Sequence, residues 1–120
     1  MRKKVFNIVL NLILNPNMLT INTYDLQNNS DFEEILGFKF TPTDVLKTKS
    51  EKNHRKANLI NAATLDSISP TRVLIHLLVN EQEKCIKSCV KAVGNQQIIV
   101  GRGFAIPIHA IFQVEIIPAA

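Results

Sequence analysis

The sequence predicts an α/β fold, in which a small mixed sheet includes a strand–helix–strand unit in the C-terminal half. Residues 72–79 are almost continuously apolar, which is typical of a strand covered on both faces. Residues 81–93 have apolar side chains at helical spacing, and 98–100 form a second apolar run. Because strand, helix and strand follow one another, we expect a βαβ-type unit. A mostly-β sandwich is the alternative.

The helix expected over 81–93 rests on its first residues and on its two faces. Asn80 is a suitable N-cap, and Glu83 three residues later completes a capping box. One face carries the apolar residues Cys85, Ile86, Cys89, Val90 and Val93, and the other carries Lys84, Lys87 and Lys91. A strand would distribute these lysines over both of its faces, so the pattern favours a helix that ends at Gly94.

Residues 1–69 are expected to form an N-terminal α+β extension. The apolar run 5–14 is interrupted by two asparagines and fits either a strand or a helix, and the turn-forming residues 15–17 end it. Residues 18–26 contain β-branched and aromatic side chains and predict a strand.

Two helices are expected in the rest of this extension. Ser30 and Glu33 form a capping box for a short helix that ends at Gly37. Thr43 is the expected cap of a longer helix over about 44–65, which includes a basic stretch. A solvated helix face or a linker is the alternative for that stretch.

The main internal boundary is placed at residues 67–70, where serines and a proline break the pattern. It separates the extension from the unit 70–120, and we expect both to belong to one compact domain. Within the second unit, residues 104–117 fit two structures. Pro107 and the preceding Gly-x-Gly favour a helix, whereas the alternating β-branched residues favour a strand.

The net charge of +4 is concentrated in one stretch. Residues 47–56 carry five basic groups and one acidic group, and the charges of the remaining residues sum to zero. The sequence therefore predicts a local basic patch rather than a strong field over the whole molecule.

Two short motifs in the C-terminal half resemble a known family. Residues 98–106 read Ile-Ile-Val-Gly-Arg-Gly-Phe-Ala-Ile, and residues 114–117 read Val-Glu-Ile-Ile. Together with the spacing of the two strands, these motifs are similar to those of the Alba superfamily, which includes small-subunit relatives in RNase P and RNase MRP. The resemblance implies a strand–helix–strand–helix order and binding to nucleic acid. The lysines that the family has after its first strand are absent, since Leu-Leu-Val-Asn stands at 77–80.

Phosphate contacts are expected from the basic residues and from the glycine turn. Backbone N–H groups and one guanidinium in 101–103 can hold a phosphate, although a tight turn with a solvent-facing arginine explains the same residues. The expected contact residues are Lys47, Lys49, Lys52, Arg55, Lys56, Lys84, Lys87, Lys91 and Arg102, with Gly101 and Gly103.

No catalytic or metal-binding motif is found, so we expect neither enzyme activity nor a cofactor nor a small-molecule substrate. Cys85 and Cys89 with His76 and His109 lack the usual zinc-knuckle spacing and fit core packing better. Reduced cysteines favour an intracellular protein. The basic start and the apolar run 5–14 are similar to a targeting segment, but the run is too short to span a bilayer.

Two functions are compatible with these features. The first is a non-catalytic nucleic-acid-binding protein that binds RNA or DNA, is directed mainly to RNA, and is part of a ribonucleoprotein. The second is a structural subunit of a homo- or hetero-oligomeric assembly, because 5–14 and 104–118 have more apolar residues than one small core needs.

Overall fold

A bent antiparallel meander forms the body of the protein. The computed structural model describes residues 22–118. Six consecutive strands occupy the C-terminal part of this range, and the last of them returns to pair with the first. They are β2 (Val73–Val79), β3 (Gln82–Ser88), β4 (Val90–Val93), β5 (Gln97–Val100), β6 (Phe104–Pro107) and β7 (Ile111–Ile116).

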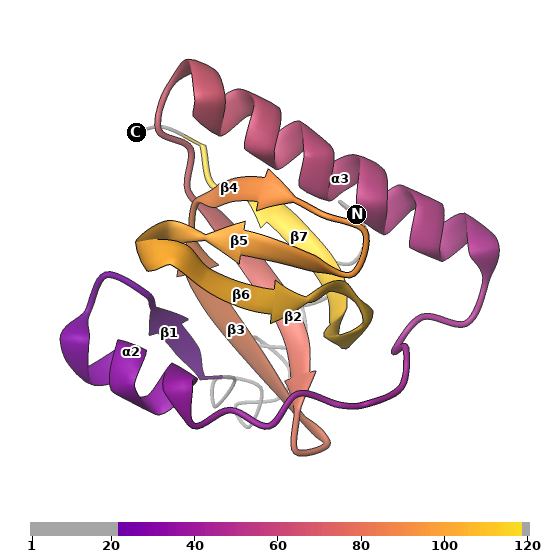
Figure 1. Ribbon diagram of the computed structural model, residues 1–120, viewed down its shortest axis with the longest axis horizontal. Coiled ribbons are helices and arrows are strands. Elements are labelled where there is room, and N and C mark those ends of the chain that lie inside the picture. Colours follow the sequence, from indigo (N-terminus) through magenta and orange to yellow (C-terminus); the bar gives the residue numbers. More distant parts are fainter. Residues whose placement is uncertain (1–21, 119–120) are drawn as a thin grey trace, which may run out of the picture.

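The strands belong to two sheets that are joined at two places, between β3 and β4 and between β6 and β7. One sheet has the order β1-β3-β2-β7, in which the short strand β1 (Thr23–Asp25) lies parallel to β3, and the other has the order β4-β5-β6. Only Cys89 separates β3 from β4, so one continuous stretch of chain passes from the first sheet to the second. In Figure 1 the β4-β5-β6 sheet lies in front of the larger sheet, and the strands of the two sheets cross.

The core lies between the facing surfaces of the two sheets. Every second residue of β2, beginning with Val73, is buried, and Ile98 and Ile106 of the other sheet belong to the same apolar cluster. The helix α3 (Lys49–Ile68) adds Leu59 and packs against β4 and β7, which places it across both sheets (Figure 1). Each such side chain contributes roughly 1.5–3 kcal/mol when it is fully buried.

The helix predicted over 81–93 is wrong, because these residues form β3 and β4. Asn80 and Glu81 have φ values of 51° and 64°, the geometry of a two-residue type I′ hairpin turn, so Asn80 is a turn residue and not a helix cap. The following strand pairs with β2 along its whole length, from Val79 opposite Gln82 to Val73 opposite Ser88.

Two properties of these residues explain the error. Ile86, Ser88 and Val90 are buried and alternate with period two, as in a strand. Ile86 and Val90, like Cys85 and Cys89, are also four residues apart, which is the spacing of one helix face. Lys84 and Lys87 do lie on opposite faces of β3, and both are only partly exposed: Lys84 lies over the ring of Tyr24, and Lys87 is paired with Asp25 of β1. Long side chains on a central strand can thus cover apolar surface with their stems.

The strand–helix–strand order that the resemblance to the Alba superfamily implied is therefore absent from residues 70–118. The broader prediction of a mixed α/β fold holds, with two sheets and two helices in the described residues. For residues 104–117 the strand interpretation is confirmed: β6 and β7 are joined by a single 3₁₀ turn at Ile108–Ala110.

The N-terminal predictions are confirmed in part. The short helix α2 (Asn29–Leu36) ends before Gly37, but its cap is Asn28, whose side chain accepts a hydrogen bond from Asp31 N–H. Thr48, and not Thr43, caps the longer helix, with a complete capping box to Glu51. Within the strand predicted at 18–26, residues 22–26 are described, and of these Thr23–Asp25 form β1. The apolar run 5–14 lies outside the described residues.

Candidate nucleic-acid interface

The first two turns of α3 carry a row of lysines. Lys49, Lys52 and Lys56 are spaced by three and four residues, which aligns them along one side of the helix, and Lys47 directly precedes the cap. Lys47, Lys49 and Lys52 are exposed, and in the described part of the chain none of them forms a salt bridge. We call these four residues the lysine row.

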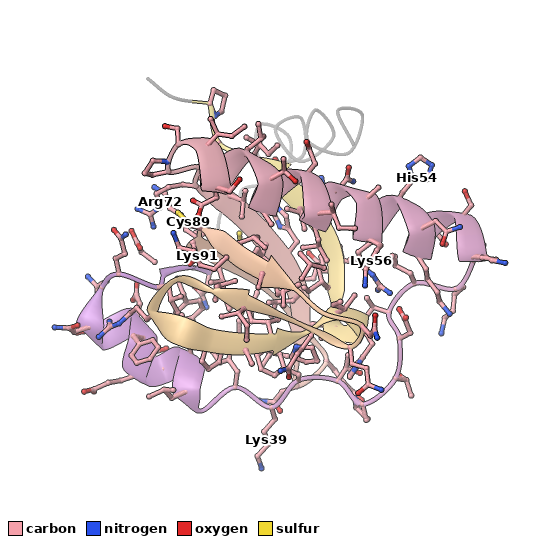
Figure 2. The ribbon with its side chains drawn as sticks, turned by 45° about the horizontal axis from the view of Figure 1, so that its top comes forward. Lys39, His54, Lys56, Arg72, Cys89 and Lys91 are labelled. Carbon is pink, nitrogen blue, oxygen red and sulfur yellow. The ribbon has the colours of Figure 1, made fainter. Side chains whose placement is uncertain are left out.

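The lysine row is held against the second sheet at one point. Lys56 is partly buried, and its Nζ donates a hydrogen bond of 2.7 Å to the carbonyl oxygen of Gly94, in the turn between β4 and β5. In Figure 2 Lys56 points toward the sheets, whereas His54 projects from the outer side of the helix. The row therefore continues onto the β4–β5 turn.

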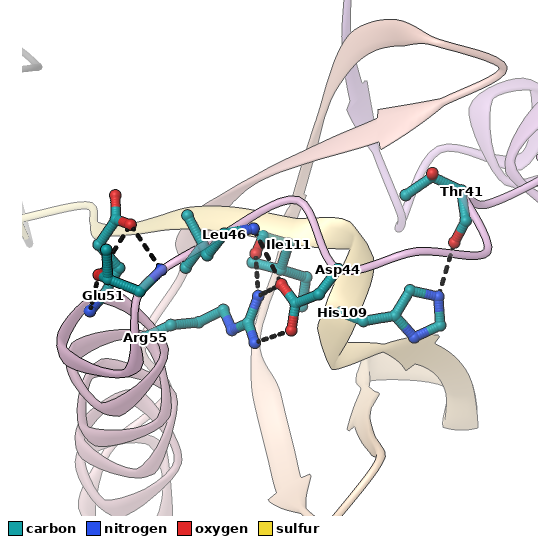
Figure 3. A network of polar contacts seen from close by, with 8 residues as sticks. Thr41, Asp44, Leu46, Glu51, Arg55, His109 and Ile111 are labelled. Carbon is teal, nitrogen blue, oxygen red and sulfur yellow. Dashed lines mark hydrogen bonds and ion pairs between the residues drawn. The ribbon is translucent and has the colours of Figure 1, made fainter.

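Arg55 differs from the other basic residues of the stretch 47–56, because it points into the protein. Its guanidinium donates hydrogen bonds of 2.8 and 2.9 Å to the two carboxylate oxygens of Asp44, and one of 2.9 Å to the carbonyl of Ile111 (Figure 3). Arg55 is only 7% exposed. The hydrogen bonds from Arg55 to the Asp44 carboxylate lower the pKa of Asp44 from 3.8 to about 2. Arg55 thus joins α3 to β7 and is not placed to meet a phosphate.

A cleft of about 510 Å³ opens beside the lysine row. Its wall includes three consecutive amide side chains, Asn95, Gln96 and Gln97, at the start of β5. The adjacent wall is built from the 3₁₀ turn, where Ile108 N–H donates a hydrogen bond of 2.9 Å to the carbonyl of Gln96 and His109 Nε2 lies 2.6 Å from the carbonyl of Thr41 (Figure 3). The remaining lining residues are Asp44, Arg55 and Pro107.

This cleft is not predicted from the sequence, since Asn95 and Gln96 are expected to lie in the short link after a helix. The signal that was available is Gly94-Asn95, a dipeptide common in hairpin turns. Its two arms are the paired strands β4 and β5.

The Gly101–Gly103 turn lies at the other end of β5. Gly94 precedes this strand and Gly101 follows it, so the four-residue strand, about 13 Å long, separates Arg102 from the lysine row. Figure 1 agrees, since the β5–β6 turn lies beside α2 while the start of α3 lies at the opposite side of the molecule.

Gly101 N–H and the guanidinium of Arg102 have partners within the protein. Gly101 N–H is directed to the carbonyl of Cys89 and to Ser88 Oγ, at 3.0 and 3.2 Å. The guanidinium of Arg102 lies 4.1 Å from the ring centre of Phe32 and donates to Asn29 Oδ1 and to the carbonyl of Leu26. Arg102 and Gly103 both have positive φ, of 69° and 75°. The turn therefore attaches α2 and the residues after β1 to the second sheet.

The remaining candidate lysines do not join the row. Lys91 forms a salt bridge of 2.8 Å with Asp66, whose pKa is lowered by that hydrogen bond. Lys84 and Lys87 lie on β3, next to β1. Of the basic residues predicted from the sequence, the structure brings together Lys47, Lys49, Lys52 and Lys56.

The two cysteines are not activated as nucleophiles. Burial raises the pKa of Cys85 to about 12, and burial together with the Asp66 carboxylate raises that of Cys89. Within residues 22–118 no three His, Cys, Asp or Glu side chains gather in a way that would hold a metal ion. In the same range, no helix combines the length and the apolar character needed to cross a membrane.

Comparison with known proteins adds no relative: the sequence matches no protein-family model, and neither curated proteins nor solved structures gave a significant match.

Proposed function

We propose that this protein is a non-catalytic nucleic-acid-binding protein, directed to single-stranded RNA and acting within a ribonucleoprotein. The observation that carries the proposal is the lysine row, Lys47, Lys49, Lys52 and Lys56, beside a cleft whose wall has three amide side chains. Lysines neutralise backbone phosphates. Amide groups can form hydrogen bonds with the edges of unpaired bases, which is how single-stranded RNA is usually recognised.

The electrostatics of the helix end support this use of the row. The N-terminus of an α-helix carries a partial positive charge, so lysines in its first turns are unfavourable for the isolated helix. In this part of α3 the only acidic residue is Glu51, which serves as the N3 residue of the capping box. An anion bound at this end would relieve the repulsion among the lysines and the helix end.

The salt dependence of binding tests the proposal. Fluorescence anisotropy would measure the affinity for a labelled single-stranded RNA of about ten nucleotides, from about 50 mM salt upward. If the three exposed lysines Lys47, Lys49 and Lys52 each contact a phosphate, changing them to Gln should reduce the slope of log K against log salt by about 2, at about 0.7 for each contact on a single strand.

A matched variant controls for net charge. Lys39→Gln with Lys84→Gln and Lys87→Gln removes the same charge, and Figure 2 shows Lys39 on the side of the molecule away from α3. This variant should keep the slope. Absence of binding at about 50 mM salt, or equal losses in the two triple variants, would defeat the proposal. A single-stranded DNA of the same sequence distinguishes RNA from DNA as the ligand.

A second candidate, a structural subunit of an oligomeric assembly, is favoured by the other half of α3. Ile60 and Ile68 are 48% and 79% exposed, and Ile60 borders a shallow groove with Ala63 and Val93. Light scattering on the purified protein tests this candidate. An oligomer that is broken by Ile60→Glu and is indifferent to RNA would favour it over the first.

A further inference from the structure

The outer face of the larger sheet carries a row of buried side chains that no described helix or strand covers. Cys85 of β3 is paired with His76 of β2, and His76 is paired with Gln113 of β7, so the three side chains lie side by side on one face. The other face of the same strands, with Ile75, Ile86 and Val114, packs into the core.

This row is too well buried to face water. Cys85 is 1% exposed and Gln113 is 3% exposed, yet neither belongs to the apolar core cluster. The leucines that flank the row on β2, Leu74 and Leu78, are also only partly exposed. The helices α2 and α3 contribute their buried residues to the core on the opposite face. The cover of the row must therefore come from outside residues 22–118.

We propose that the N-terminal segment 1–21 of the same chain docks on this outer face, with its apolar run 5–14 over the row. The segment joins the sheet at the right place, because Asn22 directly precedes β1, the edge strand beside β3. Residues 15–22 can extend up to roughly 26 Å, which is enough to reach back from the edge across the sheet.

The sequence of the segment fits this position. Asn7, Asn11 and Asn15 recur at every fourth residue, the spacing of one face of a helix, and the other residues of 5–14 are all apolar. In this arrangement Val9 and Ile13 lie opposite the asparagines. A ten-residue helix is about 15 Å long and about 10 Å wide, which matches the roughly 10 Å between the outer strands of the row. The apolar side of such a helix would then lie on the sheet and its asparagines would face water.

The reactivity of the Cys85 thiol in the full chain tests the proposal. A Cys89→Ser background leaves Cys85 as the only thiol. Ile13→Lys should raise the rate of maleimide labelling at least about tenfold, because a charge on the docked side releases the segment. Asn11→Lys places the same charge on the side facing water and should leave the rate unchanged. Equal rates in these two variants would overturn the proposal.

Cross-linking tests the contact without disturbing the fold. In the same background, Val9→Cys or Ile13→Cys should form a disulfide with Cys85 within one chain under mild oxidation, at a yield independent of protein concentration, because contact between the two thiols and not entry of a maleimide decides this reaction. Asn11→Cys should not be joined. Cross-links between two chains would show that a second copy covers the face, and the absence of cross-links at both positions would show that another element does. Either result overturns the proposal.

Discussion

Replacing Asp44 by asparagine should destabilise the protein strongly, although Asp44 is not a core residue. Within residues 22–118 its carboxylate is the only charged partner of Arg55, whose side chain is 6% exposed, while the Asp44 side chain is 26% exposed. Asparagine has nearly the same shape as aspartate and removes only the charge. The guanidinium would keep its hydrogen bond to the carbonyl of Ile111 but would stay buried without a counter-ion.

The size of the effect follows from two considerations. Removing one partner of a buried ion pair costs about 3–5 kcal/mol, because the other charge is left uncompensated. The lowered pKa of Asp44, about 2 instead of 3.8, independently corresponds to about 2 kcal/mol of stabilisation at neutral pH. A domain of this size is typically stable by about 5–15 kcal/mol, so the loss is a large part of its total stability. Because each kcal/mol lost lowers the melting temperature of such a domain by several degrees, it should fall by roughly 10 °C or more.

Urea unfolding at neutral pH of Asp44→Asn, Arg55→Met and the double variant measures the loss and the coupling. Arg55→Met should cost less than Asp44→Asn, because methionine suits the buried position and Asp44 can be hydrated. The double variant should be more stable than the sum of the single losses predicts, by at least about 1 kcal/mol. Additive losses, or a loss below about 1 kcal/mol in Asp44→Asn, would refute this account of the pair.

The pH dependence gives a second test of the same pair. The pKa of Asp44 is lower in the folded protein than in the unfolded chain, so its contribution is complete above about pH 4 and is lost as the pH falls toward 2. Asp44→Asn lacks this titrating group. Its free energy of unfolding should therefore change less over that interval than that of the parent protein.

Three further predictions concern other parts of the molecule. Glu81→Gly should stabilise the protein by about 0.5–1 kcal/mol in urea unfolding, because Glu81 has a φ of 64° in the β2–β3 turn; a loss of about 1 kcal/mol would instead fit a helix at this position. Arg102→Ala should lower the free energy of unfolding by about 1–2 kcal/mol, because the contacts with Phe32 and Asn29 are lost. The RNA affinity should stay the same. A loss of affinity without a loss of stability would contradict a structural role for Arg102. In the salt series, Lys49→Gln alone should lower the slope by about 0.7, whereas Lys91→Gln, which loses only its pair with Asp66, should not change it.

Local sequence signals identified some elements and failed at others for a physical reason. The apolar run of β2 has the pattern of a covered strand, and no competing structure fits it. Capping-box patterns occur at Ser30, Thr48 and Asn80, but only the box at Thr48 is formed. After Asn80 the hydrogen bonds of the backbone are made with β2, so pairing between strands overrides the local preference for a helix.

The candidate site was predictable only where it is continuous in the sequence. The lysine row follows from the charge of residues 47–56, but the inward direction of Arg55 depends on Asp44 and on Ile111, which is 56 residues away. The amide-lined cleft requires the β4–β5 turn to lie beside the start of α3, and no local pattern contains that contact. Composition therefore indicated how much positive charge is clustered, while the tertiary pairing decided which of those charges face outward.

The position of β7 has a consequence for synthesis on the ribosome. Among the strands of residues 22–118, β7 is made last, yet it pairs with β2 and supplies the carbonyl that accepts a hydrogen bond from Arg55. A nascent chain that has emerged only as far as β6 still lacks both contacts, so β2 has one open edge and α3 covers an incomplete core. Folding of residues 22–118 should therefore be completed only after β7 has left the ribosome, and a premature stop before Ile111 should produce a chain that is recognised by proteases and chaperones.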